Sequence, residues 1–145
     1  MFSHSRRNLL LGISILVAGL VLIACSGNGS SSSGNVVDVT VTATDFKFES
    51  SLTTFKQGVT YHFVVTNNGT VNHEFMIMPP EPDTITPDQV TKLALAGIGS
   101  DKLTPGSTQT LDYTFTKAYP AGTLEFACHV PGHYDAGMHL PIVVQ

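Results

Sequence analysis

Three side chains that bind soft metals lie close together near the end of the sequence. Cys128, His133 and Met138 follow one another with four residues between each pair. Thiolate and thioether ligands suit copper(I), imidazole suits both oxidation states, and a long axial methionine bond completes the geometry of a blue-copper site. Such a site needs a second imidazole, and His73 on a distant predicted strand is the candidate. We therefore predict a copper site made by His73, Cys128, His133 and Met138.

Five other histidines and methionines of residues 36–145 have more ordinary expected roles. His62 lies on the polar face of its predicted strand, so we expect it to be exposed. We expect His129 to point outward, opposite the neighbouring cysteine, and His139 to lie on the surface. Met76 and Met78 offer thioethers for a soft metal, but packing in the core or at an edge is the expected role.

The first 24 residues have the features of a secretory signal peptide. Arg6 and Arg7 precede an uncharged apolar run over residues 9–23, which is short for a membrane span. The run ends in Leu-Ile-Ala-Cys, which resembles a bacterial lipobox, so we expect cleavage after residue 24 and a lipid on Cys25. An uncleaved anchor helix is the alternative. The paired arginines also resemble a twin-arginine export signal.

A tether and a single domain follow the predicted lipid site. Residues 25–35 contain the lipidated cysteine and a Gly/Ser-rich linker that cannot build a core. Residues 36–145 are long enough for one domain with one core. We therefore expect the domain to be held outside the cytoplasm, in a bacterial cell envelope, by its N-terminal lipid.

Charge and cysteine content narrow the possible functions. All 11 acidic residues but only five basic residues, all lysines, follow residue 25, which gives a net charge of −6 with histidines neutral. No basic patch for nucleic acid is expected, whereas a basic protein partner would be attracted. A lipid on Cys25 leaves no second cysteine for a disulfide with Cys128, and an exported thiol is stable when buried or bound to metal.

Alternating apolar and polar residues predict a β-sandwich. Thr86, Pro87 and Gln89 form a capping-box pattern that starts one short helix, and Gly97 is its expected stop. We predict an all-β, antiparallel Greek-key sandwich, with the Cys–His–Met segment as the loop between the last two strands. The expected strands cover residues 36–43, 46–48, 59–67, 71–78, 107–116, 123–128 and 140–144.

The Cys-x4-His-x4-Met segment, one strand before the C-terminus, resembles the ligand loop of the cupredoxins, the small blue-copper proteins. The length of the loop is most similar to the auracyanin and rusticyanin group, and the resemblance covers residues 36–145. It implies that His73, Cys128 and His133 are the equatorial copper ligands and that Met138 is the weak axial ligand.

One position departs from the family pattern. Many cupredoxins have an asparagine directly after the first histidine ligand, where it ties the two ligand segments together. Here Glu74 follows His73, and Asn72 precedes it. Either another residue makes this tie, or the tie is absent.

The resemblance also implies a function and its partners. It implies a monomeric, non-enzymatic carrier of single electrons that cycles between Cu(II) and Cu(I). Its partners would be envelope redox proteins such as cytochromes, oxidases or reductases. They would dock where the edge of His133 reaches the surface through an apolar patch.

Other copper functions match the sequence less well. Multicopper oxidases need histidines on both sides of the cysteine, but Ala127 precedes Cys128, and a binuclear centre needs a second cysteine in the loop. The remaining alternative is an envelope protein for copper storage, resistance or delivery that transfers no electrons. A structural sandwich with a decayed metal site would not keep all four ligand types.

Overall fold

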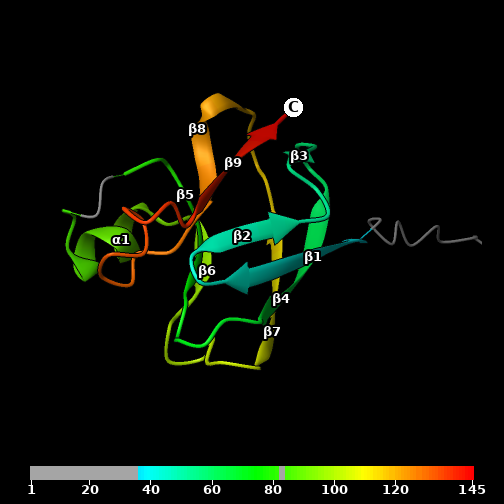
Figure 1. The fold of residues 1–145 in the computed structure, drawn as a ribbon. Coiled ribbons are helices and arrows are strands. Elements are labelled where there is room, and N and C mark those ends of the chain that lie inside the picture. Colours follow the sequence, from blue (N-terminus) through cyan, green and yellow to red (C-terminus); the bar gives the residue numbers. More distant parts are fainter. Residues whose placement is uncertain (1–35, 82–83) are drawn as a thin grey trace, which may run out of the picture. The chain divides into compact units, whose positions relative to one another are not determined.

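Alternating burial along the strands produces two sheets that enclose an apolar core. The computed structural model describes residues 36–81 and 84–145. The first sheet has the strand order β2-β1-β4-β7 and the second has β3-β9-β8-β5-β6 (Figure 1). The elements are β1 (Val36–Thr44), β2 (Lys47–Ser50), β3 (Thr54–Phe55), β4 (Thr60–Asn67), β5 (Phe75–Met78), α1 (Pro87–Leu93), β6 (Ala96–Ile98), β7 (Thr108–Thr114), β8 (Tyr119–Ala127) and β9 (His139–Val144).

The core between the sheets is rich in aromatic rings. Phe63 of β4 lies 5.7 Å from Phe126 of β8 and 5.8 Å from Phe75 of β5, measured between ring centroids, so rings from the two sheets interdigitate. All three rings are buried. Burying one such side chain contributes about 1.5–3 kcal/mol. This aromatic core gives the ligand segments a rigid base.

The predicted sandwich is confirmed, but two strand pairings differ from the antiparallel arrangement that we expected. β1 pairs with β4 in parallel, and β3 pairs with β9 in parallel. The remaining pairings in the described residues are antiparallel. Hydrophobic alternation shows which face of a strand is buried but does not show the direction of its neighbour, so the sequence pattern cannot distinguish the two cases.

The predicted helix start is confirmed, whereas the predicted stop is wrong. The Thr86 hydroxyl accepts from the Gln89 N–H, and the Gln89 side chain accepts from the Thr86 N–H, as in a capping box. The helix ends at Leu93, and Gly97 lies in β6, where it pairs with Met76 of β5. A Cβ on Gly97 would lie 2.1 Å from the Met76 sulfur, so the glycine leaves room for that side chain.

The helix α1 covers the outer face of the second sheet. Val90 packs against Met78 and Ala127 in a small apolar cluster, separate from the main core. Met78 is therefore a packing residue, as we expected. Within residues 36–81 and 84–145, no helix is long and apolar enough to span a membrane.

The segments that carry the predicted ligands are irregular. Residues 68–74 lead into β5, which begins at Phe75 and not at residue 71 as we expected. The loop 128–138 joins β8 to β9 and consists mostly of turns. The predicted signal peptide (1–24), the lipid site Cys25 and the linker (25–35) lie outside the described residues.

Candidate metal centre

Three of the four predicted ligands converge on one point. One donor atom from each of His73, Cys128 and His133 lies within 4.8 Å of the other two. The two Nδ1 atoms of the histidines are 3.2 Å apart, and the Cys128 sulfur is 3.4 Å from Nδ1 of His133. His73 and Cys128 are fully buried, while His133 is 8% exposed. Two imidazoles and one thiol that face a common point form the equatorial donor set of a blue-copper site.

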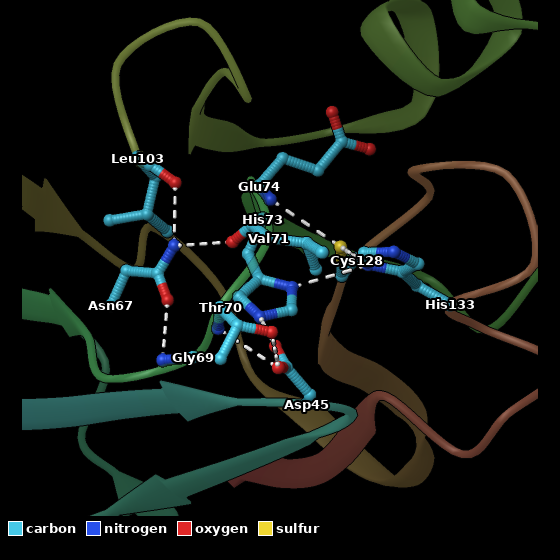
Figure 2. A network of polar contacts seen from close by, with 10 residues as sticks. All are labelled: Asp45, Asn67, Gly69, Thr70, Val71, His73, Glu74, Leu103, Cys128 and His133. Atoms are coloured by element: carbon cyan, nitrogen blue, oxygen red, sulfur yellow. Dashed lines mark hydrogen bonds and ion pairs between the residues drawn. The ribbon is translucent and has the colours of Figure 1, made fainter. Parts of the chain in front are cut away.

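The ring of His73 is held from both sides. Its backbone N–H donates to the carbonyl of Leu103 at 3.1 Å, which fixes the segment before β5. Its Nε2 lies 2.9 Å from Oδ1 of Asp45, in the turn between β1 and β2 (Figure 2). Hydrogen bonds from the hydroxyl and the backbone N–H of Thr70, together with the contact to His73, lower the pKa of Asp45 to about 2. The ionised carboxylate only accepts, so Nε2 of His73 carries the proton and Nδ1 faces the site.

A buried asparagine holds the segment that leads to His73. Nδ2 of Asn67 donates to the carbonyls of Val71 and Leu103, both at 2.9 Å, and its Oδ1 accepts from the N–H of Gly69 at 2.8 Å (Figure 2). The side chain is fully buried. In the sequence, this residue is only the end of the strand predicted over residues 59–67. The structural role of Asn67 depends on Leu103, which is distant in the chain.

Glu74 makes the tie that an asparagine makes in many cupredoxins. Its backbone N–H points at the Cys128 sulfur at 3.4 Å, and its carboxylate accepts from the N–H of His129 at 2.8 Å. The residue after the first histidine ligand therefore connects both ligand segments, which answers the question that the sequence left open. Burial raises the pKa of Glu74, while the hydrogen bond and the charge of His129 oppose that shift.

The loop that carries the other ligands is supported by its own backbone. The N–H of His133 donates to the carbonyl of Val130, and the N–H of Met138 donates to the carbonyl of His133. The N–H of Cys128 donates to the carbonyl of Met138 at 3.1 Å, which closes the loop. Gly132 and Gly137 have φ values of 83° and 98°, a region that disfavours other residues.

Met138 lies where the axial ligand is expected to come from. Its side chain is fully buried and belongs to the same apolar cluster as Cys128. Its backbone is hydrogen-bonded to that cysteine. The role of its thioether as the axial ligand stays a prediction.

The remaining histidines do not join this group. His62 is bonded to Asp112 on the outer face of the first sheet and is only half-exposed. His129 is half-buried and stacks on Tyr134, with ring centroids 4.8 Å apart, and Tyr134 stacks in turn on the exposed His139 at 4.6 Å. Within the described ranges, His73, Cys128 and His133 are the one group of this kind that could hold a metal ion.

The carboxylate of Glu125 contacts two rings of this stack, those of Tyr134 and His139. Glu125 of β8 is buried, and its carboxylate accepts from the Tyr134 hydroxyl at 2.6 Å. The same carboxylate lies 3.3 Å from Nδ1 of His139. The strand pattern predicted for residues 123–128 does not reveal this role.

Comparison with known proteins settles the family. Residues 35–145 match the sequence model of the copper-binding proteins of the plastocyanin/azurin family. The chain belongs to this family. Copper is therefore its cofactor, and the converging donors of His73, Cys128 and His133 fit that ion.

Two similar proteins are named for copper resistance. The sequence is 30% identical over 102 residues to the copper-resistant cuproprotein CopI of Rubrivivax gelatinosus, covering 68% of this chain and 60% of that protein. It is 28% identical, over an alignment of 179 residues, to the CopI of Pseudomonas aeruginosa, covering 94% of this chain and 97% of that protein. The first match thus spans less than two thirds of the Rubrivivax protein.

Solved structures of two cupredoxins share the fold. Auracyanin of Roseiflexus castenholzii superposes with a TM-score of 0.52 at 20% identity, covering 76% of this chain and 96% of that one. Rusticyanin of Thiobacillus ferrooxidans superposes with a TM-score of 0.56 at 24% identity, covering 78% and 79%. The sandwich is therefore the cupredoxin fold.

Proposed function

We propose that this cupredoxin carries single electrons between redox proteins of the cell envelope. The proposal rests on one observation: the donor atoms of His73, Cys128 and His133 are buried together and held in place by hydrogen bonds. Copper held there would supply a one-electron couple. Because the carboxylates of Asp45 and Glu74 accept hydrogen bonds from the ligand segments and fix them, the donors need to move little when the oxidation state changes. A site that rearranges little exchanges electrons quickly.

The edge of His133 is the proposed electron exit. It is the ligand nearest to the surface, since His73 and Cys128 are fully buried. The ring of Phe46, itself 40% exposed, lies 4.6 Å from the ring of His133. Pro131, two residues before His133 in the loop, is also exposed. Such an apolar rim lets a partner approach closely, and the net negative charge of the domain favours a basic partner such as a cytochrome.

Copper resistance through binding alone is the second candidate function. It is favoured by the names of the two CopI relatives. A storage or delivery site has to exchange copper readily, whereas the thiol of Cys128 is fully buried. This burial is the reason for our preference for electron transfer.

The proposed location follows from the N-terminal sequence. A lipobox ending at Cys25 and a Gly/Ser linker would tether the domain to a membrane, outside the cytoplasm. We propose that the protein acts there as a monomer and catalyses no reaction of its own. Labelling with a radioactive fatty acid would test the tether, and a Cys25→Ala variant should lose the label.

Spectroscopy and kinetics together test the function. With Cu(II) bound, we expect an intense visible charge-transfer band and an EPR spectrum with narrow copper hyperfine splitting. Stopped-flow mixing with a reduced basic cytochrome c should show fast electron transfer that slows as salt is added, because salt screens the attraction. A pale spectrum with wide splitting would show that the thiolate is not a ligand. A normal spectrum with slow transfer, together with copper-sensitive growth of a deletion strain, would favour the resistance function.

A further inference from the structure

The carboxylate of Asp45 is built into the copper site from outside the ligand set. Oδ1 of Asp45 lies 2.9 Å from Nε2 of His73, on the side of the ring opposite Nδ1 (Figure 2). Its other oxygen accepts from Thr70 twice, from the backbone N–H at 2.9 Å and from the hydroxyl at 2.6 Å. The carboxylate therefore has a fixed position. It comes from a turn 28 residues before His73 in the chain.

The backbone around this contact leaves room for it. A Cβ at Gly69 would lie 2.2 Å from Oδ1 of Asp45 and 2.7 Å from Nε2 of His73, closer than real Cβ atoms approach. The carbonyl oxygen of the Asn67 side chain holds the N–H of Gly69 and keeps the glycine in this place. The turn with Asp45 and the segment from Asn67 to His73 are thus arranged around one carboxylate–imidazole contact.

This contact has two chemical consequences. A carboxylate that accepts from Nε2–H leaves the lone pair on Nδ1, which faces Cys128 and His133. It also raises the basicity of the imidazole and places a negative charge one ring away from the metal position. Cu(II) carries one more positive charge than Cu(I), so a fixed negative charge nearby stabilises Cu(II) more.

We infer that Asp45 is a positioning residue of the copper site: it fixes the His73 ring with Nδ1 toward the metal, and its charge favours Cu(II) over Cu(I). Asp45 thereby lowers the reduction potential. The inference rests on the copper site alone, so it holds for an electron carrier and for a copper-resistance protein.

Two substitutions separate the charge from the hydrogen bond. Asp45→Asn keeps an oxygen that can accept from Nε2–H but removes the charge, while Asp45→Ala removes both. Loss of an outer hydrogen-bond partner typically costs 10- to 100-fold in metal affinity. We expect Asp45→Asn to weaken Cu(II) binding about tenfold more than Cu(I) binding, which raises the potential by about 59 mV for a one-electron couple.

The chain offers a matched control. Asp112 contacts the ring of His62 on the outer face of the first sheet, so Asp112→Asn removes the same charge from another aspartate–histidine pair. We expect its potential to stay at the wild-type value. A potential in Asp45→Asn that shifts no more than in Asp112→Asn would overturn the role of the charge.

NMR of the copper-free wild-type protein tests the orientation and needs no substitution. At a pH where the imidazole is neutral, nitrogen–proton correlation should show His73 with its proton on Nε2. Asp45→Asn should keep this tautomer and Asp45→Ala should give a mixture, provided that dispersed spectra show both to be folded. A proton on Nδ1 in the wild type would overturn the inference. Slow electron exchange with partners would argue against the proposed function and leave this result unaffected.

Discussion

The two regions that supply the ligands are stabilised in different ways. The loop 128–138 is held by hydrogen bonds within its own backbone and by two glycines with positive φ. The segment around His73 is held by side chains from elsewhere, namely Asp45 and Asn67, and by the carbonyl of Leu103. The backbone of the loop is therefore supported locally, with Glu125 of β8 holding the Tyr134 side chain from outside, whereas the position of His73 depends on the assembled sandwich. Glu74 joins the two regions.

Cys128→Ser should have the largest effect, because it removes the donor where the two regions meet. We expect complete loss of the intense visible band, since that band requires a copper–thiolate bond. The absorption spectrum after addition of Cu(II) is the measurement. Cys25→Ser is the matched control and should keep the band. An unchanged spectrum in Cys128→Ser would refute the ligand assignment.

Asn67→Ala should damage the His73 region most. It removes the side-chain partner of the Val71 and Leu103 carbonyls and of the Gly69 N–H, and losing a hydrogen-bond partner at a buried side chain costs about 1–3 kcal/mol. We expect the free energy of unfolding to fall by about 2–4 kcal/mol, measured by urea denaturation of the copper-free protein. Asn68→Ala, at the exposed neighbouring position, should change it by less than about 0.5 kcal/mol. Equal losses in both variants would contradict the role given to Asn67.

Gly137→Ala tests the loop by itself. Its φ of 98° is strained for alanine, at a cost of about 1–2 kcal/mol. Because the loop is locally supported, we expect a changed visible spectrum, while NMR signals around Asp45 and Asn67 stay in place. Chemical shifts that move throughout both regions would show that the loop is less independent than its hydrogen bonds indicate.

Met138→Leu should have the mildest effect. Leucine fills a similar buried volume but cannot ligate, so we expect copper to stay bound by the three strong donors and the reduction potential to rise. Cyclic voltammetry measures the shift, and Met78→Leu, a buried methionine under α1, is the control. An unchanged potential would show that the thioether is not the axial ligand.

The difference between the two regions also explains what could be predicted from the sequence. Cys128 and His133 were recognisable because loop ligands stand at a fixed local spacing. His73 was found only because the site required another imidazole. Asp45 could not be predicted, since the turn after β1 meets His73 only when the sheets have formed.

For the fold too, local sequence patterns predict the longer elements but not the shortest ones. The long alternating strands and the capping box at Thr86 are local patterns, and both are confirmed. The strands β3 and β6 have two and three residues, too few to show a period. For the same reason the sequence pattern predicts a helix stop at Gly97, which belongs to β6.

The ring stack on the far side of the loop places a constraint on the length of the loop. The two loop donors and Met138, the predicted axial ligand, are each followed directly by one ring of the stack: Cys128 by His129, His133 by Tyr134, and Met138 by His139. The same five-residue step therefore spaces the donors on one side and the stacked rings on the other. A single insertion or deletion inside the loop would put both rows out of register at once. We therefore expect an exchange of this loop to preserve the site when the five-residue spacing is kept throughout.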